Sequence, residues 1–257
     1  MLGKLLKYEL KAYIRIFIPI YIAIIAMSFL NRLFGGSELF QMQFIMTTVL
    51  IGLFVALYVL SIIITIQRFR KNLLGDEGYL MFTLPVKTSS IIISKYLASL
   101  IFTILSGLVA LLSFSIIFNA VSVSEITSAF NEIWKGLSTQ PDLRRLVFIV
   151  SLALFLAYST FIFQIYLSLS VGQLPKFNKH RNVAALATFF IINVVVGYVS
   201  NSITSHMPID FDYEAGISQV SQLSANGSNY MFIISMIIIG LLFYGTVYIL
   251  NKKLNLE

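Results

Sequence analysis

Six long apolar stretches contain none of the chain's 18 Lys and Arg residues and none of its 11 Asp and Glu residues. They cover approximately Ile16–Asn31, Gln41–Ile66, Tyr96–Phe118, Leu146–Gly172, Val183–Val199 and Tyr230–Leu250. A helix of about 20 apolar residues is long enough to cross the hydrocarbon core of a bilayer. The sequence therefore predicts an all-α, multi-pass membrane protein, in which residues 1–257 form one domain with six transmembrane helices.

The composition excludes an ordinary soluble domain. Residues are 58% hydrophobic and 11% charged, whereas about 25% of the residues of a typical soluble domain are charged. Transporters driven by protons or ions usually keep an ionisable side chain inside the membrane. None of the six stretches has one, so the energy source of any transport is expected outside the membrane. The chain has no Cys, which excludes disulfides and thiolate metal sites.

The distribution of basic residues predicts the orientation. With a cytoplasmic N-terminus and six alternating helices, the external side holds only Arg32, Lys135, Arg144 and Arg145. The cytoplasmic side holds the other 14 of the 18 basic residues: Lys4, Lys7, Lys11, Arg15, Arg68, Arg70, Lys71, Lys87, Lys95, Lys176, Lys179, Arg181, Lys252 and Lys253. This positive-inside bias predicts that both termini are cytoplasmic. The basic character favours contact with anionic membrane lipids, and no basic segment has the pattern of a nucleic-acid-binding module.

Residues 1–15 are expected to form an amphipathic elbow helix on the inner membrane surface. A basic stripe of Lys4, Lys7, Lys11 and Arg15 lies opposite an apolar stripe, as in a helix that lies in the interface plane. A simple topology signal would carry the same charges. Glu9 is different, because it lies in the apolar arc, where a carboxylate needs a partner. That partner is a basic residue of the same subunit or of a partner subunit. The nearest cytoplasmic candidates are Arg68 and Arg70, so we expect an elbow-coupling link between Glu9 and one of these two residues.

Two external segments follow from this topology. In residues 119–145 the apolar side chains recur at helical spacing, which predicts a short surface helix with Trp134 as its interfacial anchor. Residues 200–229 are rich in Ser, Asn and Gln and are expected to form a solvated acidic loop. Asp210, Asp212 and Glu214 lack the remaining pattern of a calcium loop. No metal site is therefore predicted, and the two histidines, which fall on opposite sides of the membrane, cannot share one.

The cytoplasmic segment 67–95 is long for a helix–helix turn and contains an apolar cluster. The cluster consists of Tyr79, Leu80, Met81, Phe82 and Leu84, and it adjoins Asp76 and Glu77. Apolar side chains facing the cytoplasm suit a short helix that docks into a groove of another protein. The alternative is a segment that lies on the membrane or on the chain's own helices.

This segment resembles the first cytoplasmic loop of ABC-2-type permeases, the membrane subunits of bacterial ATP-driven exporters. The matching positions are Glu77-Gly78, Leu80, Phe82-Thr83-Leu84-Pro85-Val86 and Ser94-Lys95, and the start LGKLLKYELKA resembles the N-terminal elbow helix of that family. The resemblance implies a coupling helix that inserts into a separate ABC ATP-binding subunit. The contact residues would be Asp76, Glu77, Tyr79, Leu80, Phe82 and Leu84.

The resemblance also implies how the work is divided between subunits. The chain has no G-x-x-x-x-G-K-[S/T] sequence to cradle phosphates. We therefore expect a transport subunit without an ATPase site or cofactor of its own, with ATP and Mg²⁺ bound by the partner subunit. A homodimer in the bacterial cytoplasmic membrane would place the substrate pathway at its axis. On this analogy the pathway residues are Thr47, Thr48, Tyr58, Asn193 and Tyr198.

A pathway lined without charges favours an amphipathic or hydrophobic cargo. Permeases that export lantibiotics and phenol-soluble modulins are similar in size and layout, so we expect peptide export. Hydrophobic drugs or lipids are the alternative cargo, and an ATP-independent pore or a membrane scaffold is the alternative function. Each polar pathway residue could equally be a helix–helix contact, worth about 0.6 kcal/mol on average.

Overall fold

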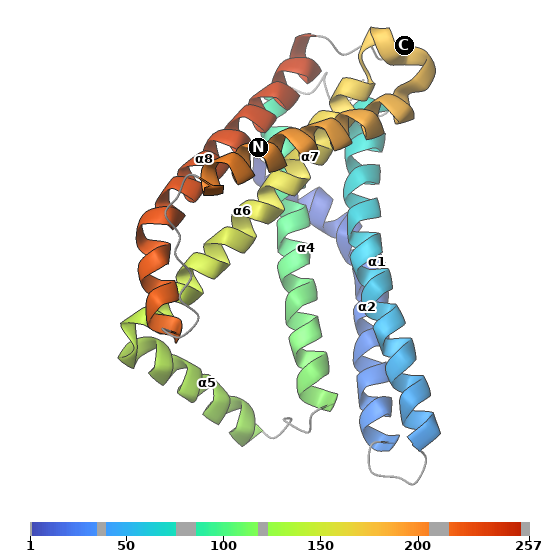
Figure 1. Cartoon of the computed structure of the whole chain (residues 1–257). Coiled ribbons are helices and arrows are strands. Elements are labelled where there is room, and N and C mark those ends of the chain that lie inside the picture. The colour runs from blue at the N-terminus through green and yellow to red at the C-terminus, as the bar shows by residue number, and fades with distance from the viewer. Residues whose placement is uncertain (1, 35–39, 76–85, 118–122, 206–215, 253–257) are drawn as a thin grey trace. The chain divides into compact units, whose positions relative to one another are not determined.

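The computed structural model describes residues 2–34, 40–75, 86–117, 123–205 and 216–252. The described residues are helical apart from short connections, and no strand occurs among them. Six helices are long and apolar enough to cross a membrane, as the sequence predicts (Figure 1). The chain divides into two compact units, unit 1 (Met1–Phe130) and unit 2 (Asn131–Glu257).

Unit 1 is built from α1 (Leu2–Phe34), α2 (Phe40–Phe69), the π-helical turn η1 (Arg70–Leu74) and α4 (Thr88–Ile117). α1 packs against both α2 and α4. The core is aromatic at its centre, where the Phe102 ring lies 5.1 Å from the rings of both Tyr13 and Phe17. The buried residues of α1 recur at intervals of three, four or seven and so lie along one face: Glu9, Tyr13, Phe17, Ile24, Ser28 and Asn31.

Polar contacts hold this face of α1 along its length. The Tyr21 hydroxyl lies 2.8 Å from Ser106 Oγ of α4, and Asn31 Nδ2 donates to Thr47 Oγ1 of α2 at 2.7 Å. Lipid tails are as apolar as leucine side chains, so association of membrane helices depends on close packing and on such hydrogen bonds. The register of α1 against α2 and α4 is therefore fixed by specific pairs.

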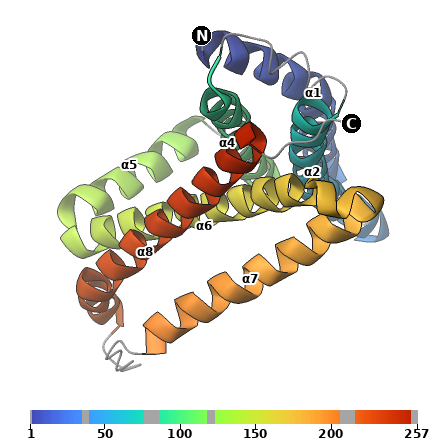
Figure 2. The same ribbon diagram turned by 90° about the horizontal axis from the view of Figure 1, so that it is seen from above.

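The predicted elbow is not a separate element. One continuous helix runs from Leu2 to Phe34 and contains both residues 1–15, apart from Met1, and the first apolar stretch. Figure 2 shows the first turns of α1 extending sideways from the remainder of the helix. Pro19 lies inside α1 and cannot donate a backbone hydrogen bond to the carbonyl of Arg15, which explains a bend without an interruption.

Unit 2 contains α6 (Pro141–Gly172), the 3₁₀ turn η2 (Pro175–His180), α7 (Arg181–Ser205) and α8 (Gly216–Lys252). α6 packs against both α7 and α8. The Phe163 and Phe243 rings meet edge to face, 5.6 Å apart, between α6 and α8. The α6–α7 connection requires Gly172, because a Cβ atom there would lie 2.6 Å from the carbonyl oxygen of Arg181.

Several predicted boundaries shift. The expected surface helix is present as α5 (Val123–Thr139), which crosses the boundary between the units, and Trp134 on it is 65% exposed. The predicted acidic loop 200–229 extends too far, because α8 already begins at Gly216. The first turns of α8 contain Gln and Ala, and no proline interrupts them, so they continue the helix. Both ends of segment 67–95 are helical, because α2 and η1 continue to Leu74 and α4 begins at Thr88. The predicted cytoplasmic loop is therefore shorter than residues 67–95.

Candidate functional site

The best-defined polar site is an ion triad that joins the three helices of unit 1. Glu9 of α1 accepts from Lys95 Nζ of α4 at 2.6 Å through Oε1. Through Oε2 it accepts from Arg68 of α2, at 2.7 Å from Nη2 and 3.0 Å from Nε. Lys95 Nζ also donates to the backbone carbonyl of Arg68 at 3.2 Å. One carboxylate therefore holds two helices against a third.

Burial makes the triad energetically important. Glu9 is 4% exposed and Lys95 is 1% exposed, while the Arg68 side chain keeps 26% of its surface in contact with solvent. Removing one member of a buried ion pair leaves an uncompensated charge, which costs several kcal/mol. The triad holds two cations and one anion, so its formal charge is +1. Glu9 is thus the only one of the three whose loss would leave two cations facing one another.

The position of Lys95 follows from the helical period of α4. Ile91, Ala98 and Phe102 are all buried and lie on the same face as Lys95, at i, i+7 and i+11 relative to Ile91. Sequence reasoning misses Lys95 as a partner of Glu9, because it assigns this lysine to the end of the cytoplasmic loop. The sequence does contain an indication of this pairing. Lys95 lies four residues after Ile91, within an apolar stripe of the helix, and a lysine at such a position needs an acidic partner.

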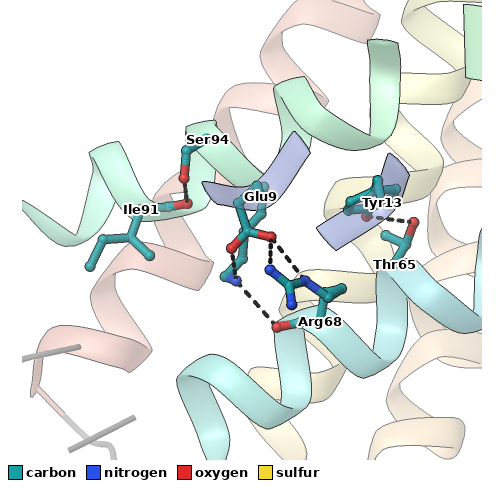
Figure 3. Close-up of polar contacts among 7 residues, drawn as sticks. Glu9, Tyr13, Thr65, Arg68, Ile91 and Ser94 are labelled. Atoms are coloured by element: carbon teal, nitrogen blue, oxygen red, sulfur yellow. Dashed lines mark hydrogen bonds and ion pairs between the residues drawn. The ribbon is translucent and has the colours of Figure 1, made fainter. Parts of the chain in front are cut away.

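A second contact lies beside the triad. The Tyr13 hydroxyl of α1 is 3.5 Å from Thr65 Oγ1 of α2, and both residues are buried (Figure 3). Tyr13 follows Glu9 by four residues and Thr65 precedes Arg68 by three, so the two contacts are one helical turn apart. This pairing fixes the rotation of α1 against α2 at the level of the triad.

The triad flanks the predicted coupling segment, Asp76–Leu84. Arg68 precedes that segment and Lys95 follows it, and both bind the same carboxylate. After Arg68, α2 ends at the fully buried Phe69 and passes into η1, where Leu73 is also fully buried. The six predicted contact residues themselves, Asp76, Glu77, Tyr79, Leu80, Phe82 and Leu84, lie outside the described residues. The helices on both sides of the segment are held to α1.

Only one of the two arginines expected near Glu9 binds it in the part of the chain that the structure describes. Arg68 binds it, whereas Arg70 is exposed and forms no ion pair with a described residue. At about 100° per residue, positions two apart point to nearly opposite sides of a helix. The basic partners of Glu9 in the structure are therefore Arg68 and Lys95.

The predicted pathway residues are divided between the two units, with Thr47, Thr48 and Tyr58 in unit 1 and Asn193 and Tyr198 in unit 2. Thr47 accepts the hydrogen bond from Asn31 described above and so makes a helix–helix contact, which is the alternative interpretation of these residues. Thr48 donates to the backbone of its own helix. Tyr58 and Tyr198 are 67% and 73% exposed. Asn193 lines a cavity within unit 2.

Within the part of the chain that the structure describes, no group of three His, Cys, Asp or Glu side chains could hold a metal ion.

Comparison with known proteins adds no relative: no family model, no curated protein and no solved structure matches this chain.

Proposed function

We propose that the chain is the membrane-spanning subunit of an ABC exporter in the bacterial cytoplasmic membrane. It works as a homodimer and moves amphipathic or hydrophobic peptides out of the cell. It has no ATPase site, and a separate ATP-binding subunit hydrolyses ATP with Mg²⁺. Support comes from six apolar stretches without an ionisable side chain for ion coupling and from the resemblance of residues 67–95 to the coupling loop of ABC-2-type permeases.

The observation that carries this proposal is the ion triad. An ATP-binding subunit that pushes on Asp76–Leu84 acts on a segment flanked by Arg68 and Lys95. Because both of these residues bind Glu9, displacement of the segment is passed to α1 as well as to α2 and α4. A buried, paired charge group resists separation more strongly than an exposed surface pair does. The triad is therefore suited to transmitting a displacement of the coupling segment to α1.

The runner-up function, an ATP-independent pore or a membrane scaffold, has less support. A pore would need no docking segment, and a scaffold would need no buried charged joint next to one. Among cargoes, hydrophobic drugs or lipids remain the alternative to peptides. The exposed Tyr58 and Tyr198 provide amphipathic side chains that suit either class.

Co-expression with the ATP-binding cassette subunit expected from the adjacent gene tests this proposal. The two proteins should copurify, and the complex should hydrolyse ATP, whereas the isolated chain should bind no nucleotide. Phe82→Ala should weaken copurification, with Phe177→Ala as the matched control, because Phe177 is an exposed aromatic residue of η2. Absence of such a gene together with absence of a copurifying ATPase would remove the proposal.

A further inference from the structure

The first four turns of α1 present a cationic face on the outside of unit 1. Lys4, Lys7, Lys11 and Arg15 are all exposed and recur at helical spacing along about 17 Å of the helix. None of the four forms an ion pair with a described residue. Glu9 is the only carboxylate in α1, and it is buried on the opposite side. This cationic face therefore carries four positive charges that no described carboxylate balances.

The opposite, apolar side of the same turns is covered by the chain itself. Leu6 and Leu10 pack against the buried core of unit 1. Lys7 and Lys11 each lie two residues from Glu9, so at about 100° per residue they point nearly away from the ion triad. A helix on a membrane surface usually places its apolar side among the lipids, and here that side is occupied. These turns therefore meet their surroundings through the cationic face.

One aromatic side chain lies among the cations. Tyr8 is 74% exposed, follows Lys4 by four residues and precedes Lys11 by three, and forms no hydrogen bond with a described residue. Tyrosine side chains collect at the level of the lipid headgroups, where the ring and the hydroxyl each find a suitable environment. α1 continues without interruption from these turns into the first membrane span. A basic cluster directly beside a span is typical of a site for anionic headgroups.

We propose that the cationic face of α1 binds the headgroups of anionic phospholipids where α1 enters the membrane. The Lys and Arg side chains contact the lipid phosphates, and Tyr8 lies between them. Each Lys or Arg near an anionic surface strengthens binding about fivefold. A zwitterionic lipid has no net charge, so the cationic face selects the anionic class. Headgroups and the ion triad then hold the same turns of α1 from opposite sides, and this binding does not depend on the export role.

The test measures which lipid lies beside position 8. The chain has no cysteine of its own, so full-length Tyr8→Cys can be labelled with one fluorophore and reconstituted into phosphatidylcholine vesicles. Spin-labelled phosphatidylglycerol and spin-labelled phosphatidylcholine are compared as quenchers at equal mole fraction. Phosphatidylglycerol should be preferred about fivefold at low salt, and the preference should fall towards one at about 0.5 M salt, which screens exposed charges. Tyr230→Cys, at an exposed tyrosine of α8 without neighbouring basic residues in the sequence, should show no preference.

Two matched double variants separate the cationic face from the overall charge of the chain. Lys7→Gln/Lys11→Gln removes two charges from the face and should lower the preference at position 8 to below about twofold. Lys176→Gln/Lys179→Gln removes the same charge from exposed sites on η2 of unit 2 and should leave the preference unchanged. All four substitutions are at exposed sites, so the thermal unfolding of both variants should match that of the parent chain.

Equal quenching by the two lipids, or an equal loss of preference in the two double variants, would overturn the proposal. Absence of quenching by either lipid would overturn it too, and loss of ATP-binding subunit copurification in Lys7→Gln/Lys11→Gln would then assign the cationic face to a protein partner. If the lipid preference fails while that subunit still copurifies with the double variant, this surface alone is refuted and the exporter assignment stands.

Discussion

Glu9→Gln should be among the most damaging single substitutions in unit 1. It keeps the size of the side chain but removes the negative charge, and so leaves Lys95, which is 1% exposed, beside Arg68 without an anion. Loss of one partner from a buried ion pair costs about 3–5 kcal/mol. Arg68 adds little to this cost, because its side chain is 26% exposed and can turn toward water.

The charge balance predicts an order among the variants. Lys95→Met removes the surplus cation and leaves Glu9 paired with Arg68, so it should cost less than Glu9→Gln, about 1–2 kcal/mol for the lost hydrogen bonds. The double variant Glu9→Gln/Lys95→Met should be more stable than Glu9→Gln alone. The interaction free energy of this pair should be about 2 kcal/mol, within the range found for residues in direct contact.

The assay is the free energy of unfolding of the purified chain, measured by detergent-induced denaturation for the single and double variants. Arg70→Gln is the matched control for Arg68→Gln, and Glu132→Gln, at an exposed site on α5, is the control for Glu9→Gln. Both controls should fall within about 0.5 kcal/mol of wild type. Additive effects of Glu9→Gln and Lys95→Met, or a loss at Arg70 equal to that at Arg68, would refute the reasoning.

Three further predictions concern other parts of the chain. Phe82→Ala should uncouple ATP hydrolysis from export while the thermal unfolding of the chain stays unchanged, because a buried aromatic anchor contributes about 2 kcal/mol or more to a docking interface; unchanged coupling would argue against docking. A single cysteine at Ser138 should react with a membrane-impermeant thiol reagent added from outside, whereas one at Ser89 should not, and the reverse pattern would invert the topology. Gly172→Ala should destabilise unit 2 by about 1–3 kcal/mol, because the new Cβ would lie 2.6 Å from a backbone carbonyl at the start of α7. The control Gly197→Ala has nothing within 4 Å of its Cβ and should not destabilise unit 2. Equal unfolding midpoints of the two variants would contradict the close contact at Gly172.

The six spans could be predicted because exclusion of charge is a property of each helix by itself. Their ends could not, since packing decides them. α4 starts at Thr88, before the apolar stretch that begins at Tyr96, because Ile91 and Ile92 are buried in unit 1. α8 starts at Gly216, within a polar segment whose composition resembles that of a loop.

The candidate site could be predicted in part, from the position of Glu9 in an apolar arc. That position implies a buried partner, but the choice between Arg68 and Arg70 depends on the rotation of α2 against α1. Lys95 required the further knowledge that α4 lies beside α1, which no local pattern supplies. The cavity that Gln164 and Asn193 line in unit 2 was not predicted, because it depends on how α6, α7 and α8 pack against one another.

Reconstitution into proteoliposomes tests the central claim most directly. The chain and its ATP-binding subunit are incorporated together, and the movement of a fluorescent amphipathic peptide across the bilayer is followed with and without ATP. We predict movement that requires both proteins and hydrolysable ATP, and that falls with Glu9→Gln as well as with Phe82→Ala. Movement of the peptide by the chain alone, at the same rate without ATP, would contradict the account and assign the chain as a pore.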